Sequence, residues 1–159
     1  MTINQRLELS KYPVIPSNAS PSDAVAVIIK LGSRFLIQER DAKVGIFYPG
    51  HWGFFGGAID NGETALAAAQ RELEEEINLK LNLTYFGKLE YSLQATDHRR
   101  ESCDTARFYF TASISKTQAT EIRLGEGKSY GFFATEEIFE LRMTPYDRFM
   151  FDWYTFNQK

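Results

Sequence analysis

The segment Ala24–Leu31, with the sequence AVAVIIKL, constrains the fold of this chain more than any other stretch. Its β-branched residues are typical of a buried strand. A turn at Gly32 and Ser33 connects it to the segment RFLIQER (residues 34–40), so we expect the two segments to form a hairpin. Since helical patterns occur elsewhere in the chain, we predict an α/β or α+β sandwich in which helices cover the core of a sheet.

Further elements follow along the chain. We expect strands at residues 52–55, 83–94, 104–114 and 128–134, and helices at residues 64–79, in the segment TEEIFEL and at Pro145–Phe156. Residues 1–23 contain PSNASPSD and are predicted to be a loose N-terminal arm. A chain of 159 residues suits one hydrophobic core, so we predict one domain at residues 24–159.

Composition narrows the function classes. The net charge of −3 does not indicate nucleic-acid binding, which usually leaves a basic surface. The single cysteine, Cys103, cannot form an internal disulfide, and this favours a reducing compartment. The N-terminal residues lack the order of a secretion signal, and no stretch approaches the about 18 apolar residues that span a bilayer. We therefore expect a cytoplasmic protein that binds neither membranes nor nucleic acids.

Residues 64–79 have a helical pattern and include the acidic run RELEEE. With about 100° per residue, Glu72, Glu75 and Glu76 fall within one arc of about 100°. Glu74 falls on the opposite side, where we expect it to be solvated. The neighbouring apolar stripe, which is predicted to pack on the sheet, consists of Leu66, Leu73 and Ile77. The three clustered acids are therefore expected at the edge of the core, where a cleft would form.

Both ends of this helix carry capping signals. Thr64 is a candidate N-cap, and Asn78 follows the last turn, where a left-handed residue is common. The preceding GGAIDNGE contributes two glycines, which let the backbone approach a ligand closely, and the additional acid Glu63.

The acidic run has two interpretations. It is either a solvated acidic face or a site for a cation, because carboxylates three and four residues apart on a helix repel by about 0.2–0.5 kcal/mol per pair. Several carboxylate oxygens suit a hard cation such as Mg²⁺ or Mn²⁺. Mg²⁺ shares its coordination with substrate phosphates, so a few carboxylates are enough for such a site.

With its flanking residues, the helix resembles the Nudix box. That pattern begins with Gly, five residues, Glu, seven residues and Arg-Glu. It continues with an aliphatic residue, any residue, Glu-Glu, any residue, Gly and an aliphatic residue. Residues 57–79 follow this pattern. Eight of its nine defined positions match, and they are Gly57, Glu63, Arg71, Glu72, Leu73, Glu75, Glu76 and Leu79. Asn78 replaces the family's second Gly, and since Asn tolerates the left-handed conformation we expect a slight effect on stability and hardly any on chemistry. The preceding WGFFGG resembles Trp-x-x-Pro-Gly-Gly, with Phe55 in place of proline.

The resemblance implies an α/β/α sandwich around a mixed β-sheet. It also implies a Mg²⁺-dependent hydrolase of nucleoside diphosphates linked to another moiety, with Mn²⁺ as a substitute. By residue match, Glu72, Glu75 and Glu76 would be metal ligands. The carbonyl of Gly57, or of Gly56 beside it, would complete the coordination.

Further roles follow from the same resemblance. Arg71 would pair with a carboxylate and orient it, with Glu63 as the first candidate partner. A free carboxylate would take the proton of the attacking water. The candidates for this base are Glu75 and Glu126, which precedes the strand predicted at residues 128–134; a surface turn is the alternative interpretation for Glu126.

A few residues outside the box are candidates for substrate contacts. Arg40 resembles the arginine found at the end of this strand in many family members and could contact phosphate, with a surface salt bridge as the alternative. Phe54, like Trp52 and Tyr48, could stack on a base, with core packing as the alternative. His98 lies in a polar loop that could border the pocket, with solvent exposure as the alternative.

The leading functional interpretation is a pyrophosphohydrolase acting on a small molecule derived from a nucleotide. The substrate stays open among nucleoside triphosphates, nucleotide sugars and dinucleotide polyphosphates. One alternative is a catalytically inactive nucleotide-binding regulator, although the intact glutamates argue against it. Another is an isomerase of prenyl diphosphates, which would need a cysteine opposite an acid, whereas Cys103 is predicted in a polar loop. The run YDRFMFDWYTF is interpreted as packing, with a homodimer contact as the alternative.

Overall fold

The computed structural model describes residues 3–8, 23–43, 48–93 and 103–158. Its strands are β1 (Ile3–Glu8), β2 (Ala24–Leu31), β3 (Arg34–Glu39), β4 (Trp52–Gly53), β5 (Thr84–Leu93), β6 (Cys103–Ser113) and β7 (Ser129–Phe133). Its helices are α1 (Ala65–Ile77), α2 (Lys116–Glu121), α3 (Thr135–Glu140) and α4 (Pro145–Phe156).

The strands form one mixed sheet in the order β1-β5-β6-β2-β3-β4, with β7 also paired to β3. β2 is central, because it runs parallel to β6 on one side and antiparallel to β3 on the other. The sheet is therefore organised around the strand that the apolar run predicted. The predicted hairpin of β2 and β3 is confirmed, with Leu31 opposite Arg34.

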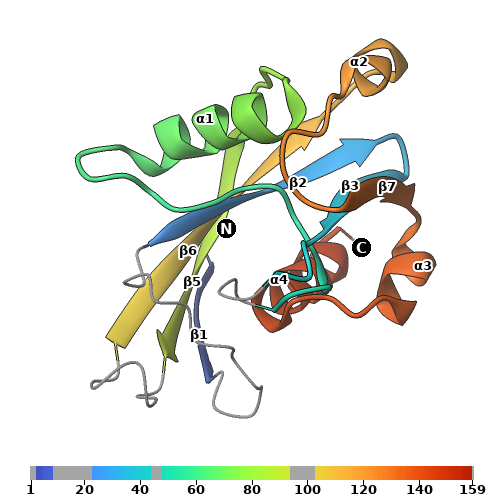
Figure 1. The fold of residues 1–159 in the computed structure, drawn as a ribbon. Coiled ribbons are helices and arrows are strands. Elements are labelled where there is room, and N and C mark those ends of the chain that lie inside the picture. The colour runs from blue at the N-terminus through green and yellow to red at the C-terminus, as the bar shows by residue number, and fades with distance from the viewer. Residues whose placement is uncertain (1–2, 9–22, 44–47, 94–102, 159) are drawn as a thin grey trace.

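Helices cover both faces of the sheet (Figure 1). α1 packs on one face, where Leu73 and Ile77 join an apolar cluster that includes Val27 of β2. α4 packs on the other face, where Phe151 joins a second cluster that includes Ile28. Successive strand residues point to opposite faces, and both Val27 and Ile28 are fully buried, so β2 is covered on both sides. The predicted sandwich of helices around a mixed sheet is confirmed.

The N-terminal segment differs from the prediction. Residues 3–8 were expected to belong to a loose arm, but they form β1, which pairs parallel to β5 from Ile3 opposite Gly87 to Glu8 opposite Ser92. The sequence INQRLE has too little hydrophobic character to indicate a strand, and the edge of β5 supplies the backbone partners that order it. α2 was also not predicted, because its sequence KTQATE has no apolar periodicity and no buried residue.

Within the described ranges, no helix is both long enough and apolar enough to cross a membrane.

Candidate active site

The acidic helix α1 begins and ends where the capping residues predict. The Thr64 hydroxyl accepts a hydrogen bond from the backbone N–H of Ala67 at 3.2 Å, so Thr64 is the N-cap. Asn78 ends the helix in the left-handed conformation, with φ 57° and ψ 36°. These two residues fix the length of the helix and thereby the positions of its glutamates.

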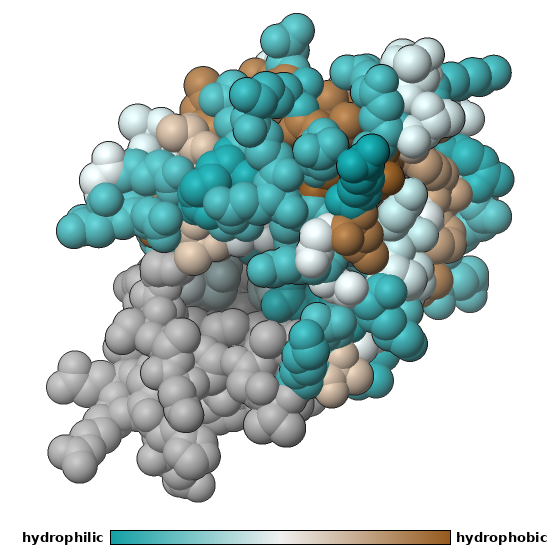
Figure 2. Space-filling view, turned by 45° about the horizontal axis from the view of Figure 1, so that its top comes forward, coloured by the Kyte–Doolittle hydropathy of each residue, from teal (hydrophilic) through white to brown (hydrophobic). Residues whose placement is uncertain are grey.

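The buried face of α1 differs from the predicted stripe at one residue. Leu73 and Ile77 are fully buried, but Leu66 is 44% exposed. Ala68 and Ala69 take the buried positions in the first half of the helix, where small side chains allow close contact with the sheet. Figure 2, which turns the α1 side of the molecule forward, shows mainly hydrophilic residues with scattered hydrophobic ones. The coloured part of this face therefore presents mainly hydrophilic residues to solvent.

Glu76 is the buried acid of the cluster, with only 6% of its surface exposed. One carboxylate oxygen, Oε2, accepts a hydrogen bond from the Gly56 N–H at 2.8 Å. The other, Oε1, accepts from the Gln38 amide at 3.3 Å. Burial raises the pKa of Glu76 to about 7, because desolvation disfavours the charged form more than these two hydrogen bonds favour it.

Glu72 lies one turn before Glu76 and faces the glycine pair. A Cβ atom at Gly57 would lie 2.5 Å from the Glu72 carboxylate, so a side chain at this position would displace the acid from the backbone. Burial raises the pKa of Glu72, and the negative charges of Glu75 and Glu126 raise it further. The carboxylates of this cluster therefore repel one another, as the sequence predicts.

Arg71 connects several groups of the box. Its Nε and one terminal nitrogen donate to the two carboxylate oxygens of Glu63, both at 2.9 Å, and this two-pronged contact is the predicted pairing. The second terminal nitrogen donates to Glu72 at 2.8 Å and to Glu75 at 3.3 Å. Hydrogen bonds from Arg71 lower the pKa of Glu63. Arg71 also donates to the Ala58 carbonyl at 3.0 Å, so it ties the helix to the loop that precedes it.

The loop that carries Glu126 is fixed to the C-terminal end of α1. The Gly125 N–H donates to the Glu76 carbonyl at 2.7 Å, and the Lys128 N–H donates to the Glu39 carbonyl at 3.0 Å. A Cβ atom at Gly125 would overlap the Glu75 carbonyl, so the close approach needs glycine. The charge of Glu126 raises the pKa of both Glu72 and Glu76, which shows that the loop brings a fourth acid to the cluster.

Other candidate residues lie in different surroundings. Phe54 was a candidate for stacking on a base, but it is 1% exposed, with its ring 6.5 Å from that of Tyr109 and 6.2 Å from that of Phe151. The prediction is wrong for this ring, because the apolar cluster on the α4 face of the sheet encloses it. Arg40 follows β3, two residues after Gln38, and its N–H donates to the His51 carbonyl; its role in phosphate binding stays a prediction.

The sequence also placed two further residues, His98 and Cys103, in a polar loop. His98 lies outside the described residues. Cys103 was predicted in a polar loop, but it is the first residue of β6.

Sequence reasoning missed Gln38 at the site and Asp147, which binds the backbone of the preceding loop at Phe54. Gln38 is 4% exposed and bonds to Glu76, and its polarity at the end of an apolar strand was the only available signal. Asp147 is 1% exposed and accepts from the Phe54 N–H at 3.0 Å. It lies in an aromatic run that indicates only packing, so its contact is visible only in the folded chain.

The donor chemistry of the cluster fits a hard cation. Within the ranges that the structure describes, no three His, Cys, Asp or Glu side chains converge closely enough to hold a metal ion as arranged. The charge of Glu126 nevertheless raises the pKa of both Glu72 and Glu76, and a cation near these carboxylates would relieve this repulsion. The Glu75 side chain is 59% exposed, so it can turn toward such an ion without disturbing the core.

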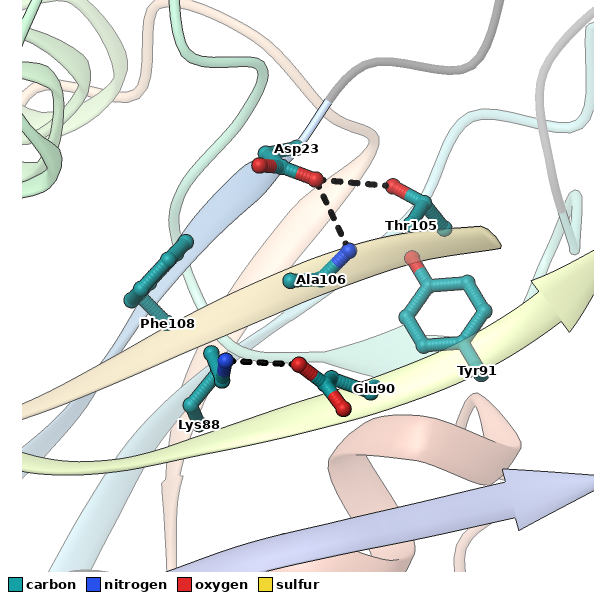
Figure 3. Close-up of a pocket in the computed structure, with 7 residues that line it drawn as sticks. All are labelled: Asp23, Lys88, Glu90, Tyr91, Thr105, Ala106 and Phe108. Carbon is teal, nitrogen blue, oxygen red and sulfur yellow. Dashed lines mark hydrogen bonds and ion pairs between the residues drawn. The ribbon is translucent and has the colours of Figure 1, made fainter. Parts of the chain in front are cut away.

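A separate recess of about 310 Å³ lies across β5 and β6, beside the start of β2 (Figure 3). It is lined by Asp23, Lys88, Glu90, Tyr91, Thr105, Ala106 and Phe108. Asp23 accepts from the Ala106 N–H at 2.9 Å, and Lys88 donates to Glu90 at 2.6 Å. β5 and β6 lie on one side of β2, whereas β3, which carries Gln38, lies on the other. The recess is therefore distinct from the glutamate cluster.

Comparison with protein families decides the assignment. The model of the NUDIX domain matches residues 20–154. The chain belongs to the Nudix family. The resemblance found in the sequence is thus confirmed, and the match extends well beyond the Nudix box to most of the described sheet and helices.

Known proteins agree with this assignment. Nucleoside triphosphatase NudI from Enterobacter sp. (strain 638) is 35% identical over 60 residues, which are 38% of this chain and 42% of that protein. The chain thus matches less than half the length of this Nudix relative.

Solved structures show the same fold. The MutT NUDIX hydrolase from Burkholderia pseudomallei superposes with a TM-score of 0.68 at 23% identity, covering 84% of this chain and 98% of that one. The MutT protein from Methanosarcina mazei Go1 superposes with a TM-score of 0.70 at 18% identity, covering 89% of this chain and 99% of that one. At these identities the likeness concerns the Nudix fold alone.

Proposed function

We propose that this protein is a divalent-metal-dependent hydrolase that cleaves the diphosphate linkage of a nucleoside diphosphate derivative. The observation that carries the proposal is the arrangement of the Nudix box. Arg71 binds Glu63 and Glu72 at the same time, while Glu76 is buried against Gly56. Family membership supports the reaction class, and the four neighbouring acids support the need for a cation.

The glutamates would hold the metal ion. Glu72 and Glu76 are the first candidates, Glu75 is the third, and Mg²⁺ is the proposed ion, with Mn²⁺ as a substitute. A bound divalent ion would lower the pKa of the attacking water and neutralise the phosphate charge. The Gly57 carbonyl already accepts a hydrogen bond from the Val25 N–H at 2.8 Å. Of the two carbonyls, this pairing favours Gly56 as the additional ligand.

The protein's own side chains would orient these ligands and move a proton. Arg71 would hold Glu72 in place by way of the rigid pair with Glu63, since outer contacts of this kind fix ligand geometry. The general base would be a carboxylate that can reach a water molecule near the ion, and Glu75 and Glu126 are the two candidates. Both lie at the exposed side of the cluster, where substrate and water have access.

Nucleoside triphosphates are the substrate class that we propose to test first. The support is the similarity to a protein called nucleoside triphosphatase NudI. Nucleotide sugars and dinucleotide polyphosphates contain the same phosphoanhydride and form the next two classes. Phe54 is not proposed as a contact for the base, because its ring is enclosed in the core.

The test is a hydrolysis assay with these three classes in the presence and absence of Mg²⁺. The Glu76→Gln variant removes the charge of a proposed ligand and is expected to lower kcat by about 100-fold or more. The matched control is Glu74→Gln, because Glu74 lies on the same helix but pairs at the surface with Lys80 at 3.3 Å. This control is expected to hydrolyse at the wild-type rate.

Different outcomes separate the candidate functions. Mg²⁺-dependent cleavage that Glu76→Gln abolishes and Glu74→Gln retains would support the hydrolase. Nucleotide binding without cleavage in any class would contradict it and favour the nucleotide-binding regulator. Equal loss in both variants would indicate a general effect of charge on the helix rather than a metal site.

A further inference from the structure

We propose that Asp147 of α4 is a positioning residue for the metal site on the opposite face of the sheet. It would act through residues 53–57, which we name the glycine strap. This inference rests on the proposed function, because it assigns a residue that sets the geometry of the same site. Asp147 itself does not touch the proposed ion or the substrate.

Asp147 holds one end of the glycine strap from a fully buried position. Its side chain is 2% exposed, and its Oδ2 accepts from the backbone N–H of Phe54 at 3.0 Å. Its Oδ1 accepts from Arg107 Nε at 3.2 Å and from the Tyr109 hydroxyl at 2.9 Å. One carboxylate oxygen therefore binds side chains of β6, and the other binds the backbone of the strap.

The start of the strap is packed directly against this carboxylate. A Cβ atom at Gly53 would lie 2.6 Å from Asp147 Oδ2, so glycine is needed for the contact. The chain before α4 also pairs with β4, because the Trp52 N–H donates to the Arg142 carbonyl and the Thr144 N–H donates to the Trp52 carbonyl, both at 2.9 Å. The position of α4 thus determines where the strap begins.

The other end of the strap contacts the proposed metal ligands. The Gly56 N–H donates to Glu76 at 2.8 Å, and Gly57 lies against the Glu72 carboxylate. Only Phe55 separates Phe54 from Gly56, and the Phe55 carbonyl accepts from the Val27 N–H at 2.9 Å. The Phe54 amide is therefore only two residues away from the backbone groups that contact both glutamates.

The sequence of the strap makes an external anchor more important. The pattern that WGFFGG resembles has proline at the position of Phe55, and proline fixes its own φ and restricts the residue before it. Phenylalanine imposes neither restraint. The hydrogen bond from Phe54 to Asp147 restrains the first of these two residues from outside the strap.

A matched pair of double variants tests this role. Arg107→Met/Asp147→Asn and Arg107→Met/Asp147→Leu both remove the buried ion pair and have side chains of similar shape at position 147. Only asparagine has an oxygen that accepts from Phe54, while its amide group can donate to the Tyr109 hydroxyl. The two proteins therefore differ chiefly in the bond to the strap.

The expected difference concerns the metal site. In the leucine variant, the Mg²⁺ concentration for half-maximal hydrolysis should be at least about tenfold higher than in the asparagine variant. Its kcat should fall by a larger factor than the factor by which its KM for the nucleotide changes. A purely structural role of Asp147 would lower the melting temperature of both variants and leave the half-saturating Mg²⁺ concentrations equal, which would overturn the proposal.

A second measurement needs neither metal nor activity. Hydrogen exchange of the Gly56 amide is measured by NMR in the presence of a chelator. The exchange rate reports on the hydrogen bond from this amide to Glu76. We expect this amide to lose protection in the leucine variant relative to the asparagine variant, while the amide of Leu89 in β5 is equally protected in both. Equal protection of Gly56 would contradict the proposal. If the wild type shows no Mg²⁺-dependent hydrolysis, the proposed function fails and this exchange experiment alone decides the role of Asp147.

The single variant Asp147→Asn provides an independent arm if the leucine variant does not fold. Arg107 and Phe54 bind different oxygens of Asp147, and the single oxygen of asparagine can take only one of these two positions, so Gly56 protection should be lower than in wild type. Adding Arg107→Met should then restore the protection, although it removes a further buried group. Failure of this restoration would contradict the role of Asp147 in holding the strap.

Discussion

Glu76 of the Nudix box is an acidic residue in a buried position. The helix places it 6% exposed against the sheet, where its carboxylate is poorly solvated. Hydrogen bonds from Gly56 and Gln38 satisfy both oxygens, but they compensate only part of the desolvation. In the absence of a cation, Glu76 therefore binds its proton more tightly than a solvated glutamate does.

This property predicts a pH dependence of stability in metal-free protein. The pKa of Glu76 is raised from 4.5 to about 7, so the folded state binds the proton more tightly than the unfolded state. The contribution to stability is complete below pH 4.5 and is lost as the pH rises through 7. Glu76→Gln lacks this loss, so its stability relative to wild type should increase by on the order of 3 kcal/mol over this range. Urea denaturation in chelator at both pH limits measures it, and a constant difference would contradict the assigned pKa.

Arg71 is the second residue whose geometry permits a prediction. Arg71→Lys keeps the charge but cannot bond Glu63 with two nitrogens and Glu72 with a third. We expect a loss of about 1–3 kcal/mol in the free energy of unfolding, measured with urea. The control is Arg34→Lys, whose ion pair with Glu137 is about half exposed at 48% and 50% and should contribute less than about 1 kcal/mol. Similar losses in the two variants would show that the contacts of Arg71 are no stronger than a surface pair.

At the scale of the element, α1 is defined by its ends as much as by its buried face. Thr64 and Asn78 set its first and last residues, and the thirteen residues between them are helical. Asn78 has φ 57°, a conformation that glycine adopts with less strain. The replacement of the family's glycine by asparagine therefore preserves the helix end at a small cost in stability.

Substitutions at this helix end should change stability without changing the chemistry. Asn78→Gly is expected to stabilise the protein by up to about 1 kcal/mol, whereas Asn78→Ala is expected to destabilise it by about 1 kcal/mol. Denaturation curves measure both, and kcat should be unchanged in either variant. A large change in kcat would show that the helix end influences the glutamates directly.

At the scale of the whole molecule, the sheet extends beyond the residues that the NUDIX domain model matches. The NUDIX domain match begins at residue 20, whereas β1 adds an edge strand from residues 3–8. In the sheet order, β5 and β6 separate β1 from β2. β1 is therefore expected to contribute to stability and not to the geometry of the Nudix box.

Removal of the edge strand tests this division of roles. Deletion of residues 1–8 should lower the free energy of unfolding by on the order of 2–4 kcal/mol, since each lost backbone hydrogen bond contributes about 1 kcal/mol. Deletion of residues 1–2 alone is the control and should have little effect. Hydrolysis per folded molecule should be the same in both proteins. Unchanged stability after the longer deletion would contradict a structural role for β1.

Much of the fold and of the site was predictable from local sequence. The buried strand β2, the hairpin with β3 and the capped helix α1 follow from apolar runs, a glycine turn and capping residues, which act over a few neighbouring positions. The pairing of Arg71 with Glu63 followed from the family resemblance. β1 and α2 were missed, because their sequences carry no periodic apolar signal, and β1 also depends on the distant backbone of β5.

The sequence by itself determined the family, the central strand and the helix that presents the acids, since these depend on residue type and spacing within short segments. Only the tertiary structure decided that Phe54 is enclosed, that Gln38 supports Glu76 and that Asp147 holds the glycine strap. Asp147 and Phe54 are 93 residues apart in the chain. Their contact depends on how α4 and the strap meet at the sheet, and no local pattern encodes the burial that makes such a contact strong.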